Sequence, residues 1–151
     1  MSSVKALAVL FVLAAPTAGL AADRPRVIDT KFVVWLAQKD GSETEHVTTI
    51  VPYLPGRACF GWSVLIENAP DFVALRETLQ LPAPAGSWRA PGSTIAADGT
   101  AAKSDRVVTP IDGQIGVRWC LADGDPLGPH TIDISSEDWL DTTFAFEVVA
   151  P

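Results

Sequence analysis

The sequence predicts an all-β protein that folds as a single antiparallel β-sandwich of seven to eight short strands. Three observations indicate this class. The chain of 151 residues is 48% hydrophobic, which is enough for one core and too short for two. The 12 prolines and 11 glycines are spread along it and interrupt any long helix. Between them lie short runs rich in β-branched and aromatic residues, the pattern of strands joined by turns.

Residues 1–22 have the pattern of a secretory signal peptide. Lys5 is followed by an unbroken apolar run at residues 6–15, then by Pro16 and a series of small residues. As a helix this run would span only about 15 Å, half of a bilayer core, so an uncleaved membrane anchor is the weaker interpretation. We expect cleavage after Ala21, a mature domain at residues 23–151 without a membrane span, and a periplasmic or secreted location.

The first half of the mature chain contains four predicted strands, at residues 27–37, 46–53, 59–67 and 73–81. A turn at residues 39–41 separates the first two. In the fourth segment apolar residues alternate with polar ones, and Glu77 is the one polar residue on the apolar face. Helical spacing also fits this segment, so the choice between strand and helix at residues 72–81 stays open.

The second half begins with a loop rich in proline, glycine and alanine at residues 82–99, which contains Trp88. Two strands are then predicted at residues 106–109 and 114–121, on either side of an Asp-Gly turn. A terminal hairpin of residues 131–134 and 142–149 completes the predicted sandwich.

The two cysteines, Cys59 and Cys120, are expected to form one disulfide in an oxidising compartment. They are not a Cys-x-x-Cys pair, which disfavours a redox centre or a zinc site. Each cysteine alternates with a tryptophan of its own strand, Trp62 or Trp119, so that the two residue types face opposite sides. If the tryptophans face the core, both cysteines face outward, and they can meet only on neighbouring strands of one sheet.

The end of the chain resembles a known class of domain. Residues 124–134 form a Gly/Pro-rich loop that leads into a strand, and residues 144–149 alternate aromatic and aliphatic residues. This order is similar to the closing hairpin of small exported immunoglobulin-like modules of bacteria, although residues 135–140 depart from their usual Asp-Gly turn. The resemblance covers about 30 residues. It implies an immunoglobulin-like sandwich and carries no catalytic motif.

Acidic residues dominate the end of the chain. The formal net charge is −7 and the pI about 4.6, which argues against a nucleic-acid partner. After Cys120 there is no lysine or arginine, and the following seven acids occur: Asp123, Asp125, Asp133, Glu137, Asp138, Asp141 and Glu147. This segment is a solvated face, a docking surface for a cationic partner, or a calcium site. A calcium site would need Asp123 and Asp125 together with Glu137, Asp138 or Asp141, and the spacing does not match an EF-hand.

Five tryptophans and two histidines are the remaining candidates. Trp35, Trp62 and Trp119 lie within strands and are expected in the core. Trp88 and Trp139 lie on loops, where an indole either covers the end of the core or anchors a partner. We expect the histidines, His46 and His130, at strand ends in water and not in a shared metal site.

No hydrolase, zincin, P-loop or dinucleotide motif is present. We therefore predict a non-catalytic binding module without a cofactor or metal. Its partner is a protein with a basic surface, for which it acts as inhibitor or adaptor. The predicted contact residues are Trp139, Asp138, Asp141, Asp123, Asp125 and Trp88. The alternative is an enzyme with an unrecognised site, which a pocket lined by a serine, a histidine and a carboxylate would favour.

Overall fold

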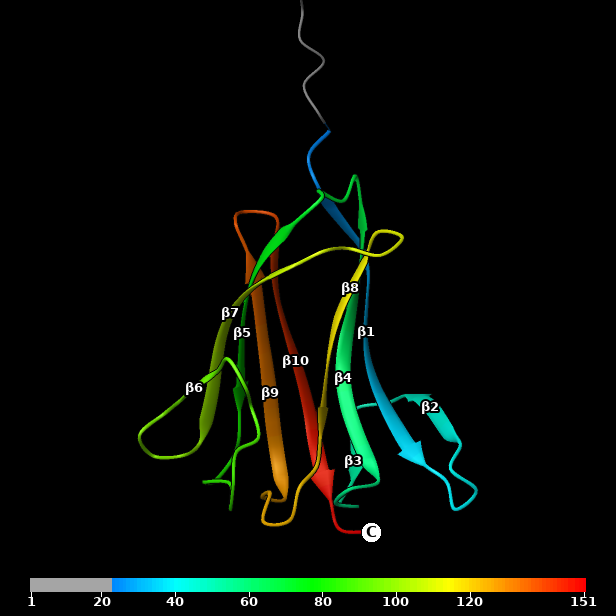
Figure 1. Ribbon diagram of the computed structural model, residues 1–151, viewed down its shortest axis with the longest axis vertical. Helices are drawn as coiled ribbons and strands as arrows, with labels where there is room; N and C mark the ends of the chain where they lie inside the picture. Colours follow the sequence, from blue (N-terminus) through cyan, green and yellow to red (C-terminus); the bar gives the residue numbers. More distant parts are fainter. Residues whose placement is uncertain (1–22) are drawn as a thin grey trace, which may run out of the picture.

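The computed structural model describes residues 23–151, which form ten strands in two sheets that face each other (Figure 1). The predicted signal peptide lies outside the described residues. The all-β sandwich class is confirmed, with more strands than the seven or eight predicted. No helix in the described part of the chain is long and apolar enough to cross a membrane.

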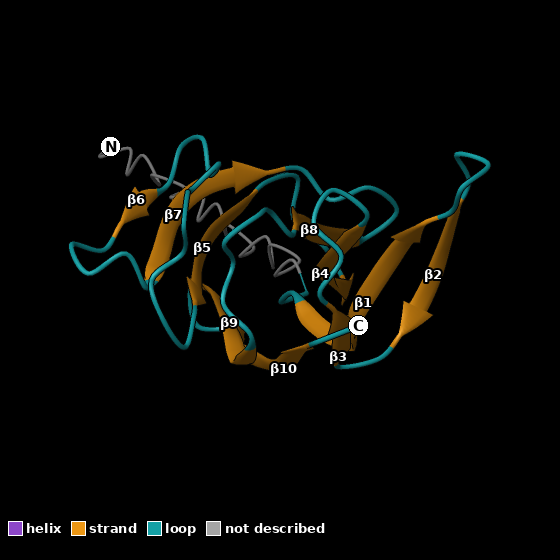
Figure 2. Cartoon of the chain, turned by 90° about the horizontal axis from the view of Figure 1, so that it is seen from below, coloured by secondary structure: helices purple, strands orange, loops and turns teal. Residues whose placement is uncertain are grey.

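The first sheet has four strands in the order β2 (Glu43–Val47), β1 (Arg26–Ala37), β4 (Ala58–Glu67) and β8 (Gln114–Cys120). The second sheet has six, in the order β3 (Ile50–Pro52), β10 (Leu140–Val149), β9 (Gly128–Ser136), β5 (Val73–Gln80), β7 (Ala101–Val108) and β6 (Thr94–Ile95). All neighbours pair antiparallel except β3 and β10, which are parallel. Figure 2 shows the two sheets from below, with β7 and β6 at the far side of the second sheet from β10.

Two segments differ from the sequence prediction. The single strand expected at residues 46–53 is wrong, because it is divided between β2 in one sheet and β3 in the other. At the crossing the Thr48 hydroxyl accepts a hydrogen bond from the Ile50 amide, which turns the chain. The loop at residues 82–99 also contains the two-residue strand β6, which the sequence did not reveal.

The segment that was open between helix and strand is strand β5. Val73, Leu75, Glu77 and Leu79 are buried, while the residues between them face outward or are half-buried. Both edges of this strand are hydrogen-bonded, to β7 and to β9. The helical alternative is therefore wrong, and the two-residue period was the decisive pattern.

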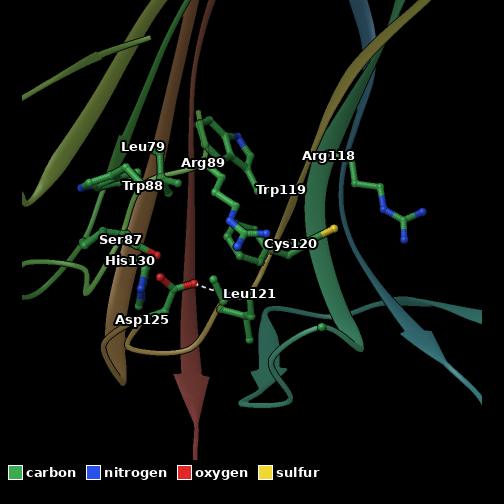
Figure 3. Close-up of a pocket in the computed structure, with 14 residues that line it drawn as sticks. Leu79, Ser87, Trp88, Arg89, Arg118, Trp119, Cys120, Leu121, Asp125 and His130 are labelled. Atoms are coloured by element: carbon green, nitrogen blue, oxygen red, sulfur yellow. Dashed lines mark hydrogen bonds between the residues drawn. The ribbon is translucent and has the colours of Figure 1, made fainter. Parts of the chain in front are cut away.

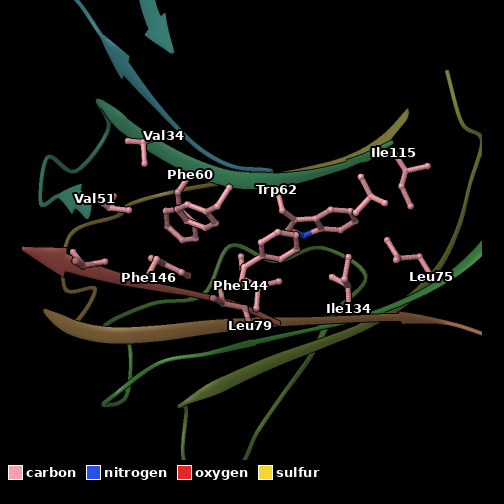
Figure 4. Close-up of a cluster of buried hydrophobic side chains, with 14 of the residues drawn as sticks. Val34, Val51, Phe60, Trp62, Leu75, Leu79, Ile115, Ile134, Phe144 and Phe146 are labelled. Carbon is pink, nitrogen blue, oxygen red and sulfur yellow. The ribbon is translucent and has the colours of Figure 1, made fainter. Parts of the chain in front are cut away.

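Aromatic side chains fill the space between the sheets (Figure 4). Phe146 of β10 lies between Phe32 of β1 and Phe60 of β4, with ring centroids 4.7 Å apart in each pair. Trp62 stacks on Phe144 with centroids 6.1 Å apart. These contacts join β1 and β4 of one sheet to β10 of the other.

The predicted disulfide is confirmed. Cys59 of β4 faces Cys120 of β8 directly, with Cα atoms 3.9 Å apart, and the bridge lies within one sheet. The adjacent Phe60 points into the core, so the cysteines lie on the outer face. Trp35 pairs with Cys59 on this same face, and the expectation that Trp35 belongs to the core is wrong. Its indole donates to Glu45 and lies under the Arg118 guanidinium.

Candidate functional site

A buried carboxylate, Glu77, lies between the two sheets. Its side chain is 1% exposed and accepts a hydrogen bond of 2.5 Å from the Trp62 indole of the opposite sheet. Arg106 of the neighbouring β7 donates to its other oxygen at 3.2 Å and to the Ser104 hydroxyl at 2.6 Å. Burial raises the pKa of Glu77, and the Trp62 hydrogen bond and the Arg106 charge partly oppose this shift.

This cluster extends toward β8 through Trp119. The Trp119 indole also lowers the pKa of Glu77, although its Nε1 is buried without a hydrogen-bond partner among the described residues. Trp119 is half-buried and packs against the core. Two donors, the Trp62 indole and the Arg106 guanidinium, thus bond to one carboxylate, and the Trp119 indole lies near it without bonding to it.

Next to this cluster a cavity of about 420 Å³ opens between β8 and the strands β5 and β9 (Figure 3). Phe60, Leu79, Leu81, Trp88, Trp119 and Leu121 supply its apolar walls. Ser87, Arg89, Asp125 and His130 add polar groups. A concave, mostly apolar wall with a few polar groups is the usual form of a binding pocket.

His130 is buried in the wall of this cavity, contrary to the expectation that it lies in water. It is 3% exposed, its Nδ1 is 2.8 Å from the carbonyl oxygen of Gly128, and its ring stacks on Phe146. Burial lowers the pKa of His130 and raises the pKa of the half-buried Asp125, whose carboxylate accepts from the Ala122 amide. His46 is exposed on β2, where its ring contacts the Thr44 hydroxyl.

The predicted contact residues do not form one surface. Asp123 and Asp125 precede β9, whereas Asp138, Trp139 and Asp141 follow its far end. Nine residues of strand separate the two groups by about 30 Å. The calcium site that combined both groups is therefore wrong, and residues 23–151 contain no group of three potential metal ligands.

Asp138, Trp139 and Asp141 share one end of the sandwich with exposed apolar residues. Phe72, before β5, is 68% exposed, and Ile111, between β7 and β8, is 76% exposed. The strand pairings place their two loops at the same end as the β9–β10 turn, at the top of Figure 1. We call this set the end surface; it consists of Asp71, Phe72, Ile111, Asp112, Glu137, Asp138, Trp139 and Asp141.

Trp139 and Trp88 occupy different ends and have different environments. Trp139 is half-buried against the core, and its neighbour Asp138 forms an exposed ion pair with Arg24 at 3.5 Å. Trp88 packs against the core from the long loop, and its indole donates to the Gly99 carbonyl at 3.0 Å. Trp88 therefore forms a wall of the cavity, remote from the acidic turn.

A family model, described as the PM0630 beta sandwich domain, matches residues 30–149. This match covers 120 of the 151 residues. The protein belongs to the PM0630 β-sandwich domain family. No curated protein matches the sequence.

Among solved structures, this PM0630-family domain is similar to an immunoglobulin-like protein from Pseudomonas aeruginosa. The identity is 16% and the TM-score 0.57, and the match covers 85% of this chain and 99% of the other. At this identity the likeness shows the fold alone. It confirms the immunoglobulin-like sandwich that the terminal hairpin had implied.

Several site residues of this PM0630-family domain carry little or no signal in the sequence. The burial of Glu77 could have been found, because it was the one polar residue on an apolar face and such residues require partners. Its partner Arg106 was not foreseeable, because the contact depends on the pairing of β5 with β7. Phe72 lies at the start of the segment left open between strand and helix, and no pattern in the sequence marks Ile111 as exposed.

Proposed function

We propose that this protein is an exported, non-catalytic binding module that docks a cationic partner protein through the end surface. The observation that carries the proposal is the exposure of Phe72 and Ile111 at the same end as the acidic β9–β10 turn. Exposed apolar side chains next to polar ones are typical of interaction sites. The β-sandwich family membership agrees with a binding role and leaves the partner open.

The chemistry of the end surface suits a partner with basic and apolar groups. Asp71, Asp112, Glu137, Asp138 and Asp141 are all exposed. Such rim charges accelerate association with a positive surface, whereas buried apolar and aromatic contacts slow dissociation. This combination supports the proposed role as inhibitor of, or adaptor for, a cationic exported protein.

The export part of the proposal rests on the pattern of residues 1–22 and on the disulfide, which is typical of oxidising compartments. Mass spectrometry of the protein from fractionated cells should find an N-terminus at Ala22 or Asp23. Recovery of the intact chain in membranes would contradict export.

The docking proposal is tested by capture from periplasmic extract with an immobilised domain, followed by kinetics with the captured protein. Asp138→Asn with Asp141→Asn should lower the association rate, and the loss should shrink as salt rises. Trp139→Ala should raise the dissociation rate. The matched control is Asp123→Asn with Glu147→Gln, which removes two exposed acids outside the end surface. If both double variants lower the association rate equally, the end surface is not the docking site.

The cavity supports a second candidate function, acyl hydrolysis, because Ser87, His130 and Asp125 all line it. No hydrogen bond joins any two of these three residues within the described chain, so a catalytic triad is not assembled. Hydrolysis of p-nitrophenyl acetate tests this candidate. A rate that Ser87→Ala and His130→Ala both abolish would establish an enzyme, and an unchanged background rate would exclude it for this ester.

A further inference from the structure

One edge of the first sheet has unpaired main-chain groups along most of a strand, β8. Leu121 donates to the Ala58 carbonyl, and Gly113 accepts from the Ile66 amide, so the odd-numbered residues of β8 bond to β4. The N–H and C=O groups of Gly116, Arg118 and Cys120 therefore point away from β4. No residue within 23–151 pairs with them.

The two sheets are unequal at this edge. The first has four strands and the second six, and β8 is the last strand of the first sheet. Beneath β8 lie Glu77 of β5 and Arg106 of β7, as the cluster around Trp119 shows. The next strand position beside β8 would therefore lie over β7, where no strand of the first sheet lies.

A groove follows the free edge of β8. The 420 Å³ cavity lies at one part of the edge, and a smaller hollow of about 180 Å³ continues along Val117 and Trp119. Arg89 and Trp119 line both. The opposite wall is the loop that contains Trp88, Arg89 and Ser93, which forms no main-chain hydrogen bond to β8. The groove thus has a strand edge on one side, a loop on the other and an apolar cavity between them (Figure 3).

The charges of the groove favour an acidic occupant. Three arginines, Arg89, Arg106 and Arg118, line the smaller hollow in a chain whose net charge is −7. Arg106 is paired with Glu77, and Arg118 points to the outer face, where it pairs with Glu43. Arg89 has no ion pair within residues 23–151. It is exposed and available to a carboxylate.

We propose that this groove binds an extended acidic polypeptide segment of another protein, which adds a strand beside β8. Its main chain pairs with Gly116, Arg118 and Cys120, and alternate apolar side chains enter the cavity beside Trp88. An acidic side chain pairs with Arg89. The other free edge of this sheet, β2, carries Glu43 and Glu45, so it does not suit an acidic ligand. This site is separate from the end surface.

Hydrogen exchange and titration with defined peptides test the proposal. The probes are four end-blocked octapeptides in which aspartate alternates with valine, leucine, phenylalanine or tryptophan. In the free protein the amides of Gly116, Arg118 and Cys120 should exchange faster than those of Val117 and Trp119. At least one peptide should bind with Kd below about 1 mM, slow the exchange of these three amides and change the fluorescence of Trp88.

Arg89→Glu should weaken the best aspartate peptide roughly five- to tenfold and improve its lysine counterpart, because a repulsion replaces an exposed ion pair. Lys39→Glu, which makes the same charge change in the β1–β2 turn, is the matched control. Asp138→Asn with Asp141→Asn should leave peptide binding unchanged, which separates this site from the end surface.

Three results would overturn the proposal. One is failure of all four peptides to bind at 1 mM. Another is equal binding of a peptide N-methylated at alternate amides, because then the cavity takes a side chain without strand pairing. The third is protection of the three amides in the free protein together with dimer formation, because then a second copy covers the edge.

Discussion

Replacement of the buried carboxylate is the sharpest test of how the two sheets are held together. Glu77→Leu removes the acceptor of the Trp62 indole, which is 1% exposed and has no other partner within the described residues. A buried donor left without an acceptor costs about 1–3 kcal/mol of unfolding free energy. Arg106 adds little to this loss, because its side chain is 35% exposed and regains water.

At roughly 3–5 °C per kcal/mol for a domain of this size, a loss of about 2 kcal/mol lowers Tm by about 8 °C. Denaturant unfolding of the double variant Trp62→Phe with Glu77→Leu measures the specific contact, because phenylalanine has no N–H to leave unpaired. The double variant should be more stable than the sum of the single losses by about 1–3 kcal/mol. Strictly additive losses would refute the reasoning.

The pH dependence gives an independent check on Glu77. Because burial raises its pKa in the folded state, its neutral form is favoured there, and the contribution to stability is complete below the unfolded value of about 4.5. As pH rises above 4.5, the wild type should lose stability relative to Glu77→Gln, which stays neutral. If the difference instead grows in favour of the wild type, attraction to Arg106 outweighs burial.

Three further predictions concern the disulfide, a close strand contact and the buried histidine. Cys59→Ser with Cys120→Ser should cost about 4 kcal/mol in denaturant unfolding, since the bridge spans 61 residues, and an unchanged midpoint would contradict this. Gly61→Ala should lower Tm by an amount equivalent to about 1–3 kcal/mol or prevent folding, because the added Cβ would lie 2.1 Å from the Val117 carbonyl oxygen. His130 has a folded pKa below its unfolded value of 6.5, so the wild type should lose stability relative to His130→Leu as pH falls below 6.5; a difference that does not vary with pH would contradict the burial of a neutral ring.

The disulfide could be predicted because the two-residue period of a strand fixes the direction of each side chain without any knowledge of the sheet order. The same rule places Trp35 on the outer face, opposite Phe32 and Val34, and the error there came from counting every strand tryptophan as core. The same rule places His130 on the buried face, because it is two residues before Ile132 and four before Ile134. It was expected in water because the predicted strand began only at residue 131.

The division of the acidic segment follows from the length of one strand. The sequence predicted the strand between these two acidic turns only at residues 131–134. A strand of four residues would leave the turns at its two ends close to each other. The structure extends it to β9, Gly128–Ser136, and the added residues increase the distance between the two turns. Gly128 and Pro129 at its start and Ser135 and Ser136 at its end are residue types that do not predict a strand. They belong to β9 because they pair with β10.

The composition of β7 supports the proposal that another strand binds at the free edge of β8. Three of its four inward positions are smaller or more polar than the β5 residues paired with them: Ala102 pairs with Leu79, Ser104 with Glu77 and Arg106 with Leu75, whereas Val108 pairs with Val73. The Arg106 side chain is 35% exposed although its partner Glu77 is 1% exposed, so this ion pair lies at the boundary between the core and water. An added strand beside β8 would exclude water from Arg106 and thereby strengthen its attraction to Glu77, because a charge pair is stronger in a drier environment. Binding at the groove and the stability of the Glu77 cluster should therefore be coupled, and Glu77→Gln should weaken the peptide while leaving Arg89 in place.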